Sequence, residues 1–245
     1  MYYTRGGGCP LDFPSIGGGC HIIGNPDLEH ETSVNKEIGI NYTNEDGVNA
    51  GITYFHNDYK NRIGTGNVAP EYVLSSEEGG EANVQVFQWY NIPEAVIRGL
   101  EGNLQFNLSD SIQWSTNLTI MLETKDKETG VPLSIVPDYT VNAMLTWQAT
   151  EQIQLVLSGQ HYGKTESPEL SQNSGQAITG EDRDAYTIAN LNAVYQFNEN
   201  LSFNLSVKNF INTDVRREGT QASSAGANTF NEPGRSYLVS ANYTF

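Results

Sequence analysis

Basic and aromatic side chains occur together in several polar stretches of this sequence, where they could bind a ligand. These stretches contain Tyr2, Tyr3, Arg5, Arg62, Tyr72, Trp89, Tyr90, Lys164, Arg216 and Arg217. Arg is well suited to such binding, because its planar guanidinium pairs with anions and also stacks on aromatic rings. This combination of residue types therefore suits a large ligand that is both aromatic and negatively charged.

Recognisable catalytic and metal-binding patterns are absent from the sequence. The histidines are His21, His30, His56 and His161, and none stands in the setting of a hydrolase nucleophile. There is no GxSxG motif, no phosphate-binding loop and no cluster with metal-ligand spacing. We therefore predict no catalytic residues, no metal site and no resident cofactor.

The two cysteines, Cys9 and Cys20, flank a short loop rich in Gly and Pro. Their spacing fits neither a CxxC motif nor a zinc site, so we prefer a disulfide over two free thiols. A disulfide implies an oxidising compartment, yet the sequence starts without an apolar export segment. We therefore expect the chain to be a piece of a longer, exported protein.

Charge and composition narrow the class of protein further. The net charge of −16 argues against nucleic acid as a partner, because such binding depends on neutralising phosphates with Lys and Arg. No stretch approaches 18 consecutive apolar residues, so we expect no transmembrane helix. A transmembrane β-barrel hides only alternate residues from water, and this composition is compatible with one.

Apolar and polar residues alternate along much of the chain, and the strands that this alternation predicts would position the loops that hold the candidate residues. It is clearest at the C-terminus, where Tyr237, Val239 and Ala241 alternate with polar neighbours up to Phe245. A period of two residues predicts β-strands with one apolar and one polar face. About nine strands are predicted, over 32–42, 48–54, 84–108 with an interruption at Pro93, 112–122, 141–147, 153–157, 189–197, 201–207 and 236–245.

Short turns and long polar loops alternate between these strands. Short turns are predicted at 44–47, 109–111, 150–152 and 198–200, and long loops at 60–83, 164–184 and 212–233. An outer-membrane barrel has this arrangement, with short turns on the periplasmic side and long loops outside. A wet lumen also accommodates the Asn, Ser, Gln and Thr of the polar face. We therefore predict an all-β, antiparallel transmembrane β-barrel in preference to a soluble sandwich.

Several short motifs, in their order along the chain, make it resemble the C-terminal part of TonB-dependent outer-membrane receptors. The resemblance is strongest to the ferric-enterobactin, or catecholate siderophore, branch. It covers residues 2 to 245 and is carried by Gly24-Asn-Pro-Asp-Leu-Glu-His-Glu-Thr-Ser33, Asn91 with Ala95, Gly99-Leu-Glu101, Val207-Lys-Asn-Phe-Ile-Asn212, Asn231-Glu-Pro-Gly-Arg235 and terminal Phe245.

The resemblance implies a function as well as a fold. Such receptors are plugged barrels of about 22 strands in the outer membrane of Gram-negative bacteria. They import a ferric siderophore and are driven by the TonB-ExbB-ExbD system, which acts through the plug. On this basis residues 1–31 would form an extracellular loop with the disulfide, and 32–245 the last strands of the barrel. The plug would be absent from this chain, and outer-membrane lipid and lipopolysaccharide would surround it.

The resemblance also ranks the candidate ligand-binding residues. It favours Arg5 with its neighbours Tyr2 and Tyr3, and Arg217 in the last long loop. Arg62, Trp89 and Arg216 complete the set of external cations and aromatics that would contact a ferric catecholate. Glu232-Pro-Gly-Arg235 is interpreted as a turn and strand start rather than as a ligand contact.

Two other functional classes remain as alternatives. Some outer-membrane barrels are hydrolases with Ser and His near the outer rim, but no such pair is recognisable here. A passive porin or adhesin would share the alternating strands without the motifs described above. A plug encoded upstream would distinguish a receptor from both alternatives.

The disulfide can be tested in protein recovered from the outer membrane. Cys9 and Cys20 should be joined, which stabilises the loop by up to about 3 kcal/mol in the chain-entropy model. Both thiols should therefore resist alkylation until a reductant is added. Quantitative labelling of both thiols without reductant would contradict the pairing.

Overall fold

The computed structural model describes residues 2–4, 20–67, 73–74, 83–131, 133, 136–166, 182–215 and 232–245. In this part of the chain every regular element is a β-strand. The strands are β1 (Tyr2–Thr4), β2 (Cys20–Ile23), β3 (Thr32–Thr43), β4 (Asn49–Asn67), β5 (Val73–Leu74), β6 (Asn83–Ser109), β7 (Ile112–Asp126), β8 (Tyr139–Gln148), β9 (Ile153–Tyr162), β10 (Tyr186–Gln196), β11 (Leu201–Lys208) and β12 (Ser236–Tyr243).

Among the described residues, none forms a helix that is long and apolar enough to cross a membrane.

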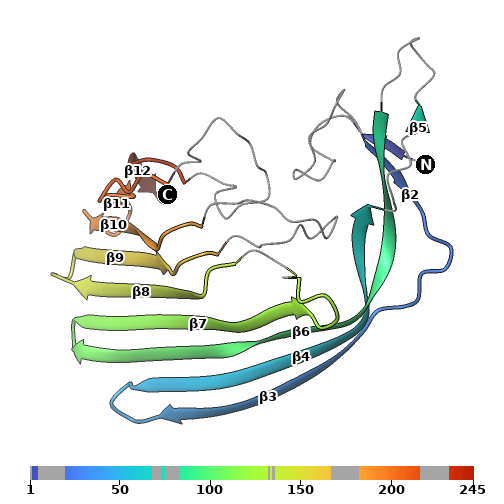
Figure 1. Cartoon of the computed structure of the whole chain (residues 1–245). Coiled ribbons are helices and arrows are strands. Elements are labelled where there is room, and N and C mark those ends of the chain that lie inside the picture. Colours follow the sequence, from blue (N-terminus) through green and yellow to red (C-terminus); the bar gives the residue numbers. More distant parts are fainter. Residues whose placement is uncertain are drawn as a thin grey trace.

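Nine strands form one continuous antiparallel meander, β3-β4-β6-β7-β8-β9-β10-β11-β12, which curves as a single layer (Figure 1). This confirms the predicted number of strands and the all-β class. Two features were not expected. Strand β2 pairs with β6 in parallel, from Cys20 opposite Gln85 to Ile23 opposite Gln88, and the short strand β5 pairs with the start of β6.

Short turns join the strands at one end of the sheet, and the strand ends that lead into the longer connections lie at the other end (Figure 1). The first turn is closed by two bonds to Asn44, whose backbone N–H donates to Val48 O and whose side-chain oxygen accepts from Val48 N–H. Gly47 has a backbone φ of 83°, a left-handed value that glycine adopts without strain. The predicted turn at Asn44 to Gly47 is thus confirmed.

Strand register gives the meander one mostly apolar face and one mostly polar face. Leu205 lies opposite Ala193 on one side and Val239 on the other, whereas Ser206 lies opposite Asn192 and Leu238. We call the face that carries Leu205 the apolar face and the opposite one the polar face. The pairing confirms the predicted division of β11, with Leu201, Phe203, Leu205 and Val207 on the apolar face.

The apolar face has no second layer packed against it in the described chain. Ile38, Ile40 and Val239 keep 73%, 74% and 72% of their surface exposed. Among the residues whose side chains are described, the buried hydrophobic ones are Ile92, Ala95, Val96 and Val215. Exposed side chains of this kind, repeated over nine strands, require an apolar surrounding to be stable.

Strands β4 and β6 are longer than the sequence predicts. Residues 60–67, expected in a loop, extend β4, and β6 runs without a break through Pro93. The ladder pairs Lys60 with Glu94 and Arg62 with Ile92, so Pro93 lies opposite Asn61. Asn61 has a φ of 53°. Pro93 forms no ladder pair with either neighbouring strand, so the missing N–H of Pro93 costs no ladder hydrogen bond.

Two described parts of the N-terminal segment form strand pairing that was not expected. Residues 1–31 were predicted to be irregular, but Tyr2–Thr4 pairs with Cys20–Ile22 and so forms a short hairpin. Cys9 lies outside the described residues, and of Cys20 only the backbone is described, so the disulfide stays a prediction.

Replacing Leu205 with Arg should destabilise the assembled barrel by roughly 2–4 kcal/mol, because the side chain lies near the middle of a strand on the apolar face. Ser206→Arg is the matched control, since its side chain is on the polar face, and it should cost less than about 1 kcal/mol. Denaturant titration of the full receptor in lipid vesicles measures both. Equal costs for the two variants would refute the assignment of the faces.

Candidate functional site

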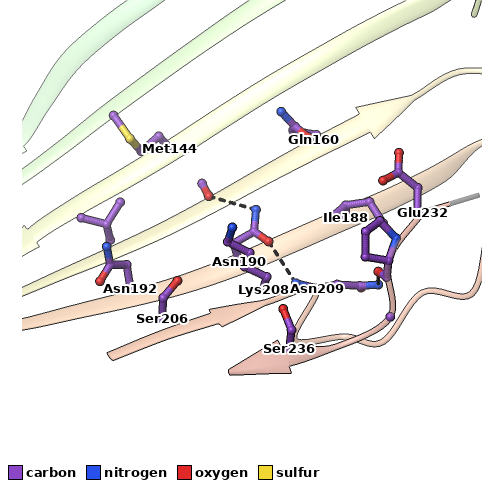
Figure 2. Close-up of a pocket in the computed structure, with 14 residues that line it drawn as sticks. Met144, Gln160, Ile188, Asn190, Asn192, Ser206, Lys208, Asn209, Glu232 and Ser236 are labelled. Atoms are coloured by element: carbon purple, nitrogen blue, oxygen red, sulfur yellow. Dashed lines mark hydrogen bonds between the residues drawn. The ribbon is translucent and has the colours of Figure 1, made fainter. Parts of the chain in front are cut away.

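A hollow with a volume of about 440 Å³ lies on the polar face of the last five strands (Figure 2). Its wall combines hydrogen-bonding side chains with a few apolar ones. The polar lining residues are Ser158, Gln160, Asn190, Asn192, Ser206, Lys208, Asn209, Glu232 and Ser236. Such a wall can hold water or a polar ligand through neutral donors and acceptors, with one cation and one carboxylate near its outer rim.

Strand register brings these side chains together. Asn190 lies opposite Ser158, and its amide donates to Ser158 Oγ over 3.5 Å. Asn192 lies opposite Ser206, and its buried side-chain oxygen has no hydrogen-bond partner among the described residues. A buried acceptor of this kind is expected to bind water or a ligand donor. The hollow is thus built from alternate residues of neighbouring strands.

Asn209 ties the rim of the hollow to the base of the last long loop. Its side chain donates to Thr213 O over 2.9 Å and to Pro233 O over 3.1 Å, and it accepts from Thr213 N–H. Its own N–H donates to Asn190 Oδ1 (Figure 2). Asn209 is 2% exposed and has a φ of 48°, a left-handed value that Asn tolerates better than most residues.

The Glu232–Arg235 segment closes the same loop base from the other side. Glu232 N–H donates to Val215 O, and Arg235 N–H donates to Asn212 Oδ1. These contacts agree with the interpretation of this segment as a turn and strand start. Glu232 has a second role, because its carboxylate lines the hollow and accepts from Tyr186 OH.

The loop between β9 and β10 has a base of its own. Lys164 pairs with Asp182 at 2.8 Å and with Glu166 at 3.5 Å. The hydrogen bond to Asp182 raises the pKa of Lys164 above its ordinary value. Arg183, which is 5% exposed, has its guanidinium carbon 5.8 Å from the centre of the Tyr186 ring. Lys164 therefore has carboxylate partners at the loop base.

The ligand-binding residues predicted from sequence are only partly described. Arg5, Arg216 and Arg217 lie outside the described residues. Tyr2 and Tyr3 are in β1, with only their backbone described.

Arg62 and Trp89 are the two predicted residues whose placement is visible. Arg62 lies opposite Ile92, and Trp89, which is exposed, lies opposite Thr65. Successive residues of a strand alternate between faces, so these two side chains point to opposite faces of the sheet. Asn25 donates to the backbone oxygen of Trp89, which fastens the connection before β3 to β6.

Two histidines have side-chain partners, and both lie on the apolar face. His56 contacts Tyr54 OH and Asp58, and His161 contacts Tyr139 OH and Thr187 Oγ1. Neither partner set contains a serine or cysteine nucleophile. The described residues also contain no group of His, Cys, Asp and Glu that could hold a metal ion.

Comparison with known proteins identifies the family. Residues 1–210 match the family model described as TonB dependent receptor-like, beta-barrel. The chain belongs to the TonB-dependent receptor β-barrel family. The resemblance seen in the sequence motifs is thereby confirmed.

Individual members of this family are similar to the chain in both sequence and fold. It is 45% identical over 247 residues to the ferric enterobactin receptor PirA of Pseudomonas aeruginosa, and 36% identical over 258 residues to the ferrienterobactin receptor of Escherichia coli. A crystal structure of a mutant ferric enterobactin receptor, PfeA of Pseudomonas aeruginosa, in complex with enterobactin has a TM-score of 0.77 and 42% identity over 93% of this chain.

The chain covers only part of these relatives. It is matched over its whole length, yet it spans 32% of PirA and 33% of the Escherichia coli receptor. It likewise covers 33% of the PfeA chain in the enterobactin complex.

Asn209→Ala should weaken the rim of the hollow by about 2 kcal/mol, because it removes three side-chain hydrogen bonds from a buried position. The amide of Thr213 then exchanges with solvent about thirtyfold faster, as measured by hydrogen exchange of the full receptor. Asn198→Ala, in a short turn at the opposite end of the sheet, is the control. Unchanged Thr213 exchange in Asn209→Ala would show that Asn209 does not hold the loop base.

Proposed function

We propose that the complete protein is an outer-membrane receptor that imports a ferric siderophore of the catecholate class. In this proposal the chain forms nine neighbouring strands of the barrel wall. A plug outside this chain links the receptor to the TonB-ExbB-ExbD system. Iron enters as part of the transported complex, so no resident metal or cofactor is involved.

The observation that carries the proposal is the division of one curved layer into an exposed apolar face and a polar face with a hollow. An apolar face over nine strands is stable against membrane lipid, and a polar face is stable against a water-filled lumen. Short turns at one end and long connections at the other support the same placement, with the short turns in the periplasm.

The ligand class is supported by the names of the relatives and by the chemistry of the candidate residues. Relatives that match the whole chain are ferric enterobactin receptors. A ferric catecholate is aromatic and negatively charged, and Arg can both pair with it and stack on it. Because the net charge is −16, attraction of such an anion has to be local.

We assign the principal ligand contacts to Arg5 and Arg217. Tyr2, Tyr3, Arg62, Trp89 and Arg216 form the surrounding set. The hollow with Asn190, Asn192 and Ser206 offers a hydrated path along the lumen wall. Neutral amide and hydroxyl groups suit passage, because they exchange hydrogen bonds with a moving ligand without holding it by charge.

A chimeric receptor tests the proposal. In it, this chain replaces the matching third of PirA from Pseudomonas aeruginosa, whose own plug and earlier strands are retained. The chimera should restore uptake of radioactive iron from ferric enterobactin in a strain that lacks its catecholate receptors. The double variant Arg5→Ala, Arg217→Ala should lower uptake at least about tenfold, since each charged hydrogen bond contributes roughly 1.5–3 kcal/mol.

Assembly of the chimera is measured separately from uptake, by its resistance to unfolding in detergent at room temperature. An assembled chimera that imports no ferric enterobactin would refute the substrate class. Full uptake by the double variant would refute the assigned contacts and leave the receptor function standing.

A further inference from the structure

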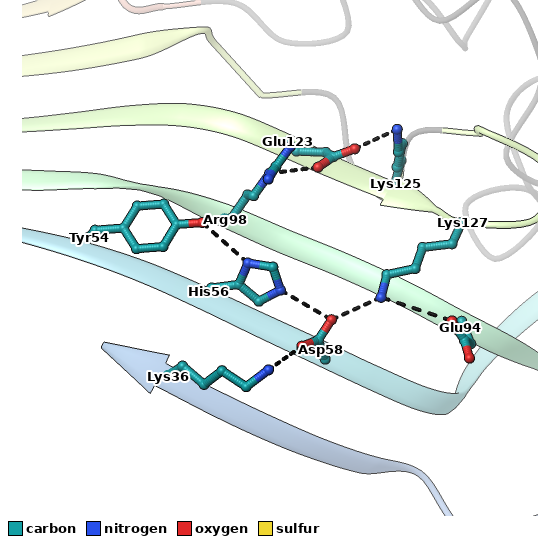
Figure 3. A network of polar contacts seen from close by, with 9 residues as sticks. All are labelled: Lys36, Tyr54, His56, Asp58, Glu94, Arg98, Glu123, Lys125 and Lys127. Carbon is teal, nitrogen blue, oxygen red and sulfur yellow. Dashed lines mark hydrogen bonds and ion pairs between the residues drawn. The ribbon is translucent and has the colours of Figure 1, made fainter. Parts of the chain in front are cut away.

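A cluster of charged side chains interrupts the apolar face on strands β3, β4, β6 and β7 (Figure 3). We call it the charged cluster and define it as Lys36, Asp58, Arg98, Glu123, Lys125 and Lys127. The matched family and the polar hollow do not account for it, because it lies on the opposite face of the sheet from the hollow.

Rows of paired residues across the sheet place the cluster at the edge of the apolar face that is farther from the short turns. Ile40 lies opposite Ile52, and the next row joins Ile38, Tyr54, Leu100 and Ile120. One row further, Lys36, His56, Arg98 and Glu123 lie side by side. The face therefore changes from apolar to charged within one step of the alternation.

The height of this change matches the outer boundary of a membrane. Asp58 is nine residues beyond Asn49, where β4 begins after a short turn. With a rise of about 3.3 Å per residue and a tilt of about 40°, that distance is about 23 Å along the membrane normal. The apolar band of an outer-membrane barrel is about 25 Å tall. In the proposed orientation the cluster thus lies at the level of the outer-leaflet headgroups.

Each carboxylate of the cluster holds two cations. Asp58 lies 2.9 Å from both Lys36 Nζ and Lys127 Nζ, and it also contacts His56. Glu123 contacts Arg98 Nε over 2.6 Å and also Lys125. Four cations face two carboxylates, and Glu94, 3.9 Å from Lys127, is a third. With Glu94 counted, the cluster keeps an excess of one positive charge, in a chain whose net charge is −16.

The carboxylates lie beneath the cations. The side chains of Asp58 and Glu123 are 26% and 17% exposed, whereas those of the four cations are 37% to 62% exposed. Hydrogen bonding to Asp58 raises the pKa of Lys127, so this lysine stays charged. The partly buried carboxylates hold the cations in place by ion pairs, and the cations are the more exposed members of the cluster.

We propose that the charged cluster binds the phosphate groups of a glycolipid in the outer leaflet. Phosphate oxygens accept hydrogen bonds from Lys and Arg, and basic groups at the edge of an apolar surface recognise anionic headgroups while the acyl chains cover that surface. Lipid occupies this face in the proposed receptor, so the inference depends on the proposed membrane placement but not on the siderophore.

The binding experiment uses the chimeric receptor, purified in dodecyl maltoside or refolded into it, with diphosphoryl lipid A as the probe. In the double variant Lys36→Gln, Lys125→Gln each carboxylate keeps one cation, namely Lys127 on Asp58 and Arg98 on Glu123. The lipid should bind this variant at least about tenfold more weakly than the parent, since each cation contributes about 1 kcal/mol at an anionic surface.

Three comparisons separate charge recognition from other effects. Lys164→Gln, Lys208→Gln removes the same charge away from the cluster and should keep the parent affinity. Lys36→Arg, Lys125→Arg keeps the charge and should keep binding. Monophosphoryl lipid A, with the same chains and one phosphate fewer, should bind the parent more weakly than the diphosphoryl form.

Equal binding of diphosphoryl lipid A to the parent and to Lys36→Gln, Lys125→Gln would overturn the proposal and leave the ion pairs as ties between strands. Complete displacement of the lipid by millimolar inorganic phosphate would replace the glycolipid with a free anion. Iron uptake and lipid binding are measured separately on the assembled chimera. The proposed function and the lipid site can therefore each be refuted without the other.

Discussion

The structure depends on the antiparallel ladders of backbone hydrogen bonds that join nine neighbouring strands. The described chain forms one layer, so no second sheet or helix covers either face, and the ladder alone satisfies the backbone. In hydrocarbon each unpaired N–H or C=O group costs several kcal/mol. Alternation then assigns every side chain to one of two environments, apolar or wet. The ladder between β4 and β6 lacks a pair at Asn61 and Pro93. This gap is tolerated because it lies beyond the charged cluster, in the half of both strands that leads to the long connections.

The two faces divide the functions of the molecule. The polar face contains the hollow, where Asn190, Asn192 and Lys208 can exchange hydrogen bonds with water or a passing ligand. The apolar face would contact lipid in the proposed receptor, and its charged cluster would mark the level of the headgroups. Asn209 connects the polar wall to the base of the last long connection, because its hydrogen bonds join Asn190 of β10 to Thr213 and Pro233 between β11 and β12.

The local alternation of residue types predicted the number of strands, their faces and the short turns, because a period of two needs no information from distant parts of the chain. It did not predict residues 60–67 or the course of β6 through Pro93, since both depend on pairing between distant strands. It also missed Asn190, Asn192 and Lys208, which look like ordinary members of a polar face. The Val207–Asn212 motif was noticed as a family mark, but the role of Asn209 follows only from its φ of 48° and its buried contacts.

The placement of the two faces is the central claim, and spin-label accessibility tests it most directly. Labels are introduced one at a time at Phe203, Asn204, Leu205 and Ser206 of the full receptor in vesicles. We predict high collision rates with oxygen and low rates with a water-soluble nickel complex at Phe203 and Leu205, and the reverse at Asn204 and Ser206. Water exposure at Phe203 and Leu205, with lipid exposure at Asn204 and Ser206, would contradict the account.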